Sequence, residues 1–440
     1  MKTIEQINKR IERGEAVVLT AEELVKMAKE TNPRQLVEKV DVVTTATFAP
    51  MCSSGAFVNF GHTNPPMRME QITLSDVEVY GGIAAVDGYI GATQESRYNK
   101  TIGGAHVIEA LIRGDDIFLK TKGKGTDCYP RVEFEGYINK DLINDFFLFN
   151  PRNAYQNYAV ATNSSDKTLY TYMGKLLPNY RNATYSTSGE LSPLLKDPNM
   201  QTIGLGTRIF LCGAEGYVVW QGTQFRNDVE TNEHGIPVSG ARTLAVIGNA
   251  KHMNSKYIKA AYFKNYGVTV FIGIGVPIPV LNEEIAYFAS RSNKEITTEV
   301  RDYGKEGKPV IGHVNYSQLR SGVIEMAGHR IRTSSISSLS MAREIANTLK
   351  RWIQEGSFLL TQPVMLFNEK RSLKELSKRD LKVESEKTPV TCIECGLCAS
   401  VCLFDALRME NGKLRFHDEL CTSCGECSDT CPVGVKLPPK

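Results

Sequence analysis

Helical periodicity is clearest between residues 339 and 353. Apolar residues recur there at three- and four-residue steps, and Gly356 follows the run: Leu339, Ala342, Ile345, Ala346, Leu349, Trp352 and Ile353. This spacing places the apolar side chains on one face, so it predicts an amphipathic helix that ends at the glycine.

A second, shorter helix is predicted near the N-terminus. Thr20 and Glu23 have the spacing of a capping box, and Leu24 and Met27 supply an apolar side. A strand-like run at residues 40–46 then leads into a turn at residues 50–55.

Strand-like and helical stretches alternate along the first 368 residues, but without a regular β-α-β period. Glycine pairs at residues 81–82 and 103–104 separate short apolar segments, as expected where strands meet turns or helix starts. We therefore predict a large domain of the α/β or α+β class.

The longest apolar run, residues 268–281, is too short and too interrupted to cross a membrane. It has 14 residues and is broken by Thr269, Gly273, Gly275, Pro277 and Pro279, whereas a membrane helix needs about 20 apolar residues. The N-terminus shows no apolar core or cleavage site of a secretion signal. These features predict a cytoplasmic protein that does not contact a membrane.

Composition divides the 440 residues into three parts. Residues 1–368 form the large domain, residues 369–388 are dense in charged side chains and are predicted to be a linker, and residues 389–440 form a small α+β domain. The chain is 42% hydrophobic, which is enough for a large core, and 52 basic residues nearly balance 49 acidic ones. No charge excess favours nucleic acid as a partner.

Eight of the 11 cysteines are concentrated near the C-terminus. They form two runs of the pattern C-x2-C-x2-C-x3-C, and each cysteine of the second run lies 29 positions after its counterpart: Cys392, Cys395, Cys398 and Cys402, then Cys421, Cys424, Cys427 and Cys431. Nothing in the sequence directs the chain to an oxidising compartment, so clustered thiols indicate metal ligands rather than disulfides.

This spacing predicts two 4Fe–4S clusters. In two-cluster ferredoxins the fourth cysteine of each run ligates the other cluster. One cluster is thus expected on Cys392, Cys395, Cys398 and Cys431, and the second on Cys421, Cys424, Cys427 and Cys402. A zinc site would show two CxxC pairs with a longer gap. Residues 389–435 resemble bacterial-type two-cluster ferredoxins, which implies low-potential electron transfer.

The three remaining cysteines lie in different settings. Cys128 lies in a glycine-rich turn with four nearby cations, which would lower a thiol pKa, or it is a structural cysteine of a hairpin. Cys52 follows a strand and precedes Ser-Ser-Gly, where backbone N–H groups often converge, or it is a small core residue. Cys212 continues an apolar run and is expected in the core.

Common nucleotide and zinc-protease motifs are missing from the sequence. There is no Walker loop, no complete G-x-G-x-x-G and no HExxH. Gly273-Ile274-Gly275 follows a strand-like run but lacks the third glycine, so a nicotinamide site there is not favoured.

Three segments around these residues resemble the homocysteine biosynthesis family of anaerobic archaea and bacteria: TFAPMCSSGAF, GTDCYPR and IGLGTRIFL. The resemblance covers roughly residues 10–370. It implies an L-aspartate semialdehyde sulfurtransferase that makes homocysteine, and it implies that Cys52 and Cys128 are the functional cysteines, with Cys128 essential.

The implied reaction joins L-aspartate 4-semialdehyde with sulfide or sulfur from a donor protein, and needs a low-potential electron donor. Cys128 would carry sulfur as a persulfide or capture the aldehyde, with Cys52 as the second thiol. Two other functions stay open: a reductase for another aldehyde or thioester, and an electron-transfer or redox-sensing subunit. The sequence leaves the oligomeric state open.

Candidates for substrate binding are less specific. Arg131, Arg68 or Arg97 could hold the substrate carboxylate through a bidentate fork, and the sequence does not choose among them. His106, after the glycine pair at residues 103–104, is a candidate proton donor or a structural histidine.

Overall fold

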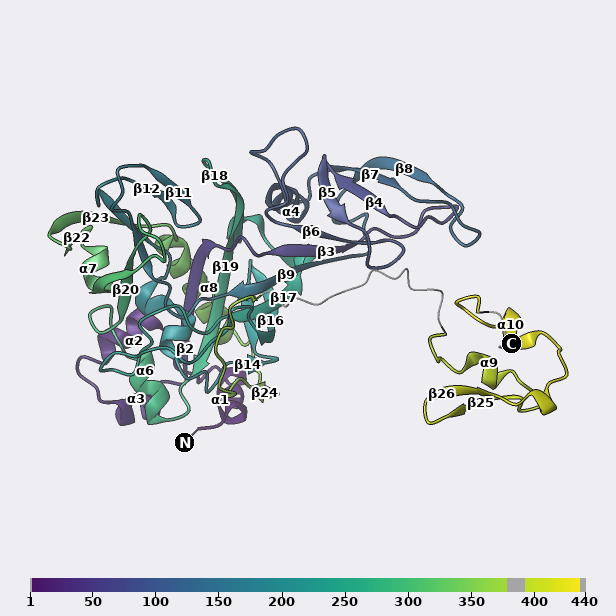
Figure 1. Cartoon of the computed structure of the whole chain (residues 1–440). Coiled ribbons are helices and arrows are strands. Elements are labelled where there is room, and N and C mark those ends of the chain that lie inside the picture. Colours follow the sequence, from purple (N-terminus) through teal and green to yellow (C-terminus); the bar gives the residue numbers. More distant parts are fainter. Residues whose placement is uncertain (1, 378–391, 436–440) are drawn as a thin grey trace. The chain divides into compact units, whose positions relative to one another are not determined.

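A computed structural model describes residues 2–377 and 392–435. The chain divides into two compact units, Met1–Lys374 and Glu375–Lys440 (Figure 1). The prediction of a mixed helix-and-strand large domain with a small ferredoxin-like region is confirmed.

The large unit is built around a 14-stranded sheet whose strands are antiparallel except for the β1–β2 pair. Its order is β1 (Val18–Thr20), β2 (Val42–Pro50), β19 (Gly267–Pro279), β15 (Arg208–Leu211), β16 (Ala214–Gln221), β17 (Leu244–Asn249), β9 (Asp145–Asn153), β3 (Gly55–Asn59), β6 (Asp87–Gly91), β5 (Val77–Tyr80), β4 (Gln71–Leu74), β7 (Ile117–Lys122) and β8 (Glu133–Ile138), with β18 (Ile258–Phe263) beside β19.

A second, six-stranded sheet lies in the same unit. Its order is β21 (Val310–Asn315), β20 (Thr297–Asp302), β10 (Val160–Thr162), β13 (Asn182–Tyr185), β23 (His329–Ser335) and β22 (Val323–Met326). Two hairpin-sized sheets complete it: β11 (Leu169–Thr171) with β12 (Gly174–Leu176), and β14 (Gly204–Leu205) with β24 (Met365–Leu366).

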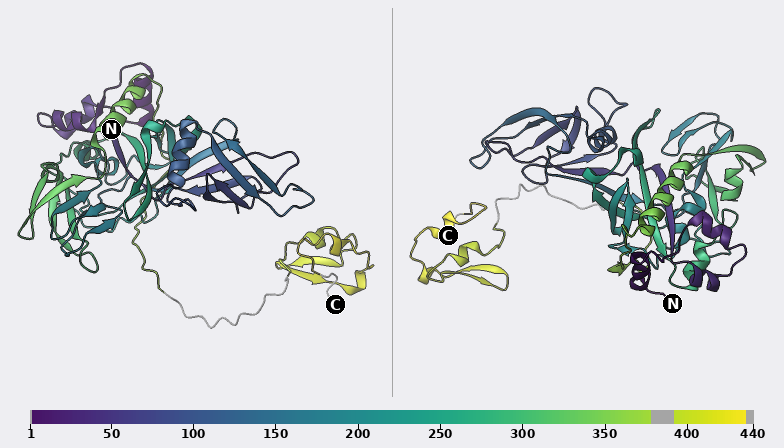
Figure 2. Two further views of the ribbon diagram at one scale, coloured as in Figure 1. Left: turned by 90° about the horizontal axis from the view of Figure 1, so that it is seen from above. Right: turned by 180° about the vertical axis from the view of Figure 1, so that it is seen from behind.

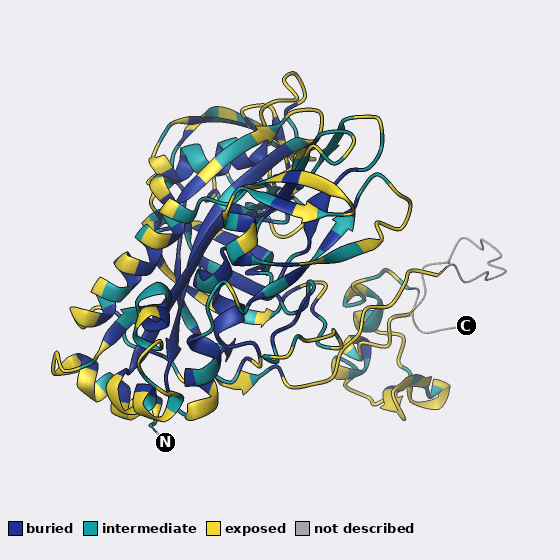
Figure 3. Cartoon of the chain, turned by 90° about the vertical axis from the view of Figure 1, so that its left-hand side faces the viewer, coloured by how far each residue is buried: buried dark blue, intermediate teal, exposed yellow. Residues whose placement is uncertain are grey.

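Helices cover the sheets, and most of these helices expose their outer faces, while the central strands are buried (Figure 3). They are α1 (Ile4–Glu12), α2 (Ala21–Met27), α3 (Pro33–Lys39), α4 (Gly104–Arg113), α5 (Pro193–Lys196), α6 (Glu283–Ala289), α7 (Tyr316–Arg320) and α8 (Leu339–Gln354).

Both helices expected from the sequence are present. At α2 the Thr20 hydroxyl accepts from the Glu23 N–H at 3.2 Å, and the Glu23 carboxylate accepts from the Thr20 N–H at 2.7 Å. Helix α8 buries the predicted apolar side. The strand expected at residues 40–46 is β2, which begins at Val42 and continues to Pro50.

The apolar run noted in the sequence forms β19. Helix α8 packs against this strand (Figure 2) and explains its glycines. A Cβ on Gly273 would lie 2.8 Å from Ile345 Cδ1, and one on Gly275 would lie 3.1 Å from Ile345 Cγ2. The glycines therefore allow the helix to approach the strand closely, which is a packing role and not nucleotide binding. Within the described ranges, no helix has the length and apolar character to cross a membrane.

The beginning of the predicted linker lies on the large unit. The Arg371 N–H donates to Asn227 Oδ1 at 2.8 Å, and its guanidinium donates to Gln221 Oε1 at 2.7 Å. Residues 378–388 of that linker fall outside the described residues.

The small unit repeats its backbone with the period of its cysteines. Helix α9 (Leu397–Ser400) and helix α10 (Glu426–Asp429) begin 29 residues apart, and left-handed Gly396 and Gly425 cap them equivalently. Between the repeats, β25 (Leu407–Glu410) and β26 (Lys413–Phe416) form a hairpin whose Asn-Gly turn has positive φ at both residues.

Candidate active site

A cavity of about 350 Å³ in the large unit contains Cys52. Its walls come from the end of β2, the end of β9, the β11–β12 hairpin, the segment after β13, and β18–β19. The cavity thus lies where the two large sheets contribute neighbouring strand ends, a usual location for a small-molecule site.

The turn that carries Cys52 is held by hydrogen bonds on both sides of the thiol. The Ser54 hydroxyl donates to the Met51 carbonyl at 2.7 Å and accepts from Asn150 Nδ2 at 2.8 Å. Met51 itself donates its N–H to the Val270 carbonyl of β19 at 2.7 Å. Cys52 is therefore fixed between β2, β9 and β19 rather than on a free loop.

Burial raises the pKa of the Cys52 thiol. The positive charge of Arg152 opposes this shift, as do the backbone N–H groups of Cys52 and Ser53, but the pKa remains above its ordinary value. The free thiol consequently rests in its protonated form at neutral pH.

Arg152 reaches the cavity from a β-bulge in β9. Asn153 pairs with Leu244 and Asn150 with Val246, so β9 has one extra residue at Pro151–Arg152. A bulge redirects a side chain that a regular strand would place elsewhere. Thr223 holds the bulge, since its N–H donates to the Pro151 carbonyl at 2.7 Å and its hydroxyl accepts from Arg152 Nε at 3.0 Å.

Four tyrosines form much of the remaining wall: Tyr155, Tyr158, Tyr172 and Tyr266. The Tyr158 hydroxyl donates to the Tyr172 hydroxyl at 2.9 Å, which is 2.8 Å from the hydroxyl of Tyr303. Burial, followed by the hydrogen bond to Tyr172, raises the pKa of Tyr158, so this group is a neutral phenol. The buried hydroxyl of Thr269, also in the wall, has no partner within the described residues.

Cys128 is not part of this wall. It lies in the loop between β7 and β8, so the hairpin setting is confirmed, but the thiol is exposed and not partly buried as the structural alternative expected. In the order of the large sheet, β7 is four strand steps from β3, on the order of 19 Å along the sheet at about 4.8 Å per step. The structure therefore does not bring Cys128 and Cys52 together as the sequence led us to expect.

Three of the four cations around Cys128 lie close to carboxylates. Lys122 Nζ lies 2.8 Å from Glu133, Lys124 Nζ lies 3.5 Å from Glu70, and Lys120 Nζ lies 3.6 Å from Glu135. These carboxylates balance much of the positive charge expected at this thiol, whereas the fourth cation, Arg131, donates to a backbone carbonyl. Cys212, in contrast, is fully buried as predicted, and burial raises its pKa to about 12.

The predicted substrate-binding residues also lie outside the cavity wall. The Arg131 guanidinium donates to the Asn64 carbonyl at 2.5 Å beside the Cys128 loop, and Arg68 is exposed. Arg97 is exposed near Glu78. His106 Nδ1 accepts from the Gly103 N–H at 3.2 Å at the start of α4, and burial lowers the His106 pKa. Their roles in binding remain predictions.

Sequence reasoning missed Arg152 and the tyrosines. The available signal was Pro151, because a proline inside a strand-like run marks a bulge or an edge. The tyrosine wall offered no such signal, since its members come from segments that the fold alone brings together.

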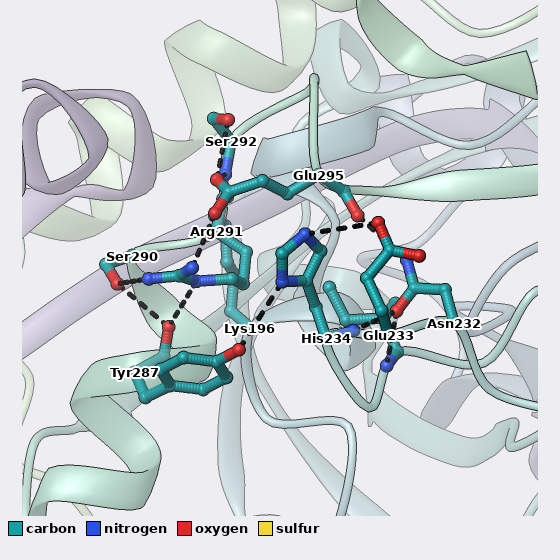
Figure 4. Close-up of polar contacts among 10 residues, drawn as sticks. Lys196, Asn232, Glu233, His234, Tyr287, Ser290, Arg291, Ser292 and Glu295 are labelled. Carbon is teal, nitrogen blue, oxygen red and sulfur yellow. Dashed lines mark hydrogen bonds and ion pairs between the residues drawn. The ribbon is translucent and has the colours of Figure 1, made fainter.

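A second buried cluster, around Lys196, is structural (Figure 4). Lys196 Nζ donates to the Arg291 carbonyl at 2.5 Å, and Arg291 Nε donates to the Tyr287 carbonyl at 2.9 Å. These cations satisfy carbonyls at and after the C-terminal end of α6. Burial lowers the pKa of Lys196 to about 7.

In the small unit, four cysteines surround each of two hollows. Cys392, Cys395, Cys398 and Cys431 line the first, and Cys402, Cys421, Cys424 and Cys427 line the second. No three His, Cys, Asp or Glu side chains of the described residues converge on a point where a single metal ion would bind. Four thiols spread around a hollow fit a multi-atom iron–sulfur cluster better than zinc.

Backbone N–H groups support this interpretation. The Glu394 N–H lies 3.4 Å from the Cys392 sulfur, and the Val435 N–H lies 3.3 Å from the Cys431 sulfur. Such donors stabilise the negative charge of ligating thiolates.

These features define a class of protein: a cysteine-containing cavity in one unit and a ferredoxin-type iron–sulfur unit in the same chain. Residues 16–360 match the model of the family described as "Homocysteine biosynthesis enzyme, sulfur-incorporation", and residues 391–435 match a 4Fe-4S dicluster domain. The chain belongs to this homocysteine biosynthesis family, and its C-terminal unit is of the iron–sulfur cluster-binding type.

Relatives extend over most of the chain. An L-aspartate semialdehyde sulfurtransferase of Methanosarcina acetivorans is 47% identical over 380 residues, 86% of this chain and 74% of that protein. A protein of the same name from Methanocaldococcus jannaschii is 48% identical over 382 residues, 83% of this chain and 73% of that protein. No solved structure shows a significant match to the chain.

Proposed function

We propose that this protein makes L-homocysteine from L-aspartate 4-semialdehyde by reductive sulfur transfer in the cavity that contains Cys52. The names of two relatives near half identity support the substrate. The observation that carries the assignment of the site is a thiol and a guanidinium that line one cavity large enough for the substrate.

The overall chemistry needs a source of electrons. When sulfide is the donor, the aldehyde, one molecule of hydrogen sulfide, two electrons and two protons give the thiol and one water molecule. Two 4Fe–4S clusters, held by the two sets of four cysteines that line the hollows, would supply electrons one at a time at low potential.

Cys52 is proposed to carry the sulfur. A buried thiol with a raised pKa is a poor nucleophile at neutral pH. A persulfide at the same position is more acidic and ionises more readily, and Arg152 favours its anion. From the persulfide, the aldehyde takes four electrons and four protons to give the thiol, water and the free Cys52 thiol, because the sulfane sulfur must also be reduced.

We assign Cys128 to sulfur acceptance at the surface. Its exposure in the β7–β8 loop makes it accessible to a donor protein. Transfer of one sulfur atom from the Cys128 persulfide to the Cys52 thiol conserves atoms and electrons. This transfer requires movement of the loop that joins β7 and β8, because Cys128 does not line the cavity that contains Cys52.

Anaerobic turnover tests the proposal. The reconstituted full chain is supplied with L-aspartate semialdehyde, inorganic polysulfide as the source of sulfane sulfur and a low-potential reductant, and homocysteine is measured by mass spectrometry. We expect homocysteine formation that depends on Cys52 and on the eight C-terminal cysteines. Failure with this aldehyde but turnover of another aldehyde or thioester would support a different reductase, and electron transfer to a partner without any turnover would support a redox subunit.

A further inference from the structure

We propose that Arg152 is the receptor for the carboxylate of the substrate, so that the cavity selects small aldehydes that carry a carboxylate group. This inference rests on the proposed function for the identity of the aldehyde. The preference for an anionic ligand at Cys52 is a separate property, and it can be measured without turnover.

The charges of the cavity wall support this role. Arg152 is the only Lys, Arg, Asp or Glu side chain among the described residues that line the cavity. In the same described ranges, no carboxylate lies within ion-pair distance of its guanidinium. The other wall residues are apolar or polar without a carboxylate, so an anionic ligand would meet one cation and no competing anion.

The local backbone directs this side chain into the cavity. The bulge at Pro151–Arg152 interrupts the regular register of β9, and the next residue but one, Ala154, has a left-handed backbone with φ +51°. Strained or irregular backbone of this kind concentrates at ligand sites. The Thr223 hydroxyl accepts a hydrogen bond from Arg152 Nε, and the positive charge of Arg152 opposes the rise in the pKa of the neighbouring Tyr155 that burial causes.

Arg152 is close enough to Cys52 for its positive charge to oppose the rise in the thiol pKa that burial causes. In aspartate semialdehyde two carbons separate the carboxylate carbon from the aldehyde carbon. A carboxylate held by Arg152 therefore places the aldehyde in the part of the cavity that Cys52 borders, which is the proximity that sulfur transfer needs.

The wall contains no acidic residue for the α-ammonium group, but it contains aromatic rings. Tyr155 and Tyr158 pack edge to face at 4.9 Å, and Tyr172 and Tyr266 at 6.3 Å. Ring faces bind ammonium groups weakly through cation–π attraction. We therefore assign the main specificity to the carboxylate, so that succinic semialdehyde, which lacks the ammonium group, is also bound.

Alkylation of the full chain tests the receptor directly. Iodoacetate and iodoacetamide form the same S–C bond with loss of iodide, but only iodoacetate carries a carboxylate. The rate ratio of iodoacetate to iodoacetamide is measured at Cys52 by peptide mass spectrometry, with Cys128 of the same chain as the internal reference.

In the unmodified chain we expect the ratio at Cys52 to exceed that at Cys128 by about tenfold, the order expected of one charge-assisted pair. Arg152→Gln should abolish the excess, and Arg152→Lys should retain part of it. Any change in the thiolate fraction of Cys52 affects both reagents equally and cancels in the ratio. Arg343→Gln is the matched control. It removes a cation on α8 that is paired with Glu22 of α2, and it should leave the ratio unchanged.

Equal ratios at the two thiols, or an excess that persists in Arg152→Gln, would overturn the proposal. Cys212 reports on folding, because it is fully buried and should stay unlabelled. If Arg152→Gln exposes it, the Arg152→Lys variant and the unmodified chain still decide the question. A carboxylate preference without any homocysteine formation would contradict the proposed reaction and leave the receptor intact.

Discussion

Two cysteine-bearing turns of the large unit differ in nearly every physical respect. The turn of Cys52 is fixed between three strands, and the thiol borders a cavity beside Arg152. The loop of Cys128 closes a hairpin at the other end of the sheet order, and the thiol is exposed. The comparison shows that a small, glycine-containing turn around a cysteine does not by itself distinguish a thiol at a cavity from a thiol at the surface.

The electrostatic difference between the two turns also could not be predicted from the sequence. Two of the cations near Cys128, Lys122 and Lys124, are partnered by Glu133 on the adjacent strand and by Glu70 just before β4. Near Cys52, the cation comes from residue 152, a hundred positions away in the chain. Local sequence therefore overstates the positive charge at Cys128 and omits the charge at Cys52.

Removing each thiol is expected to give the largest contrast. With inorganic polysulfide as the donor of sulfane sulfur, Cys52→Ser should lower homocysteine formation by about three orders of magnitude or more, the order seen for the loss of a catalytic nucleophile. Cys128→Ser should stay within about twofold with the same donor, because a small donor can load Cys52 directly and the surface acceptor step is bypassed. Full loss of homocysteine formation in Cys128→Ser, together with its retention in Cys52→Ser, would show that the two thiols have the opposite roles.

The iron content of variants distinguishes Cys52 and Cys128, which are not expected to bind a cluster, from the eight cysteines of the small unit, which are. The unmodified chain should contain about eight irons, and Cys52→Ser and Cys128→Ser should keep them. Cys398→Ala combined with Cys431→Ala should leave about four irons, because both residues line the same hollow, whereas Cys398→Ala combined with Cys402→Ala should leave almost none. The opposite pattern would mean that each sequence run holds its own cluster.

The alkylation rates of the two thiols should differ by a smaller factor, and they measure the difference in exposure and protonation directly. At neutral pH, Cys128 should react with iodoacetamide about ten times faster or more than Cys52, since the reaction follows access and thiolate fraction. Because burial raises the pKa of Cys52, its rate should still increase with pH above about 9, and Arg152→Gln should move that rise to higher pH. A plateau for Cys52 below about pH 8 would contradict the assigned protonation state.

Substitution of one glycine in each turn tests how firmly the turns are held. A Cβ on Gly55 would lie 2.7 Å from the Ile90 carbonyl, so Gly55→Ala should destabilise the large unit by about 3 kcal/mol. Gly125 near Cys128 has φ +74°, and a Cβ there would lie 2.8 Å from Cγ1 of the exposed Val132 side chain, which can move aside, so Gly125→Ala should cost only about 1 kcal/mol. Both tryptophans, Trp220 and Trp352, lie in the large unit, so urea unfolding followed by their fluorescence reports this difference. Equal losses would show that the two turns are equally constrained.

The features that could be predicted from the sequence depend on neighbours in the chain. The capping box of α2, the apolar face of α8 and the repeated cysteine spacing all involve residues a few positions apart. The cavity could not be predicted in the same way. Strand β2 pairs with β19 more than 200 residues later, and Arg152 reaches the cavity through a bulge that depends on pairing with β17. Pro151 was the only local sign of that bulge.

Tracing the transferred sulfur atom tests the central claim most directly. The full chain is loaded anaerobically with inorganic polysulfide, and the mass of each cysteine peptide is measured before and after addition of L-aspartate semialdehyde and a low-potential reductant. We expect the Cys52 peptide to gain one sulfur atom and to lose it as an equal amount of homocysteine is formed. Homocysteine formation while sulfur stays on Cys52, or loading of sulfur only at other cysteines, would contradict the account.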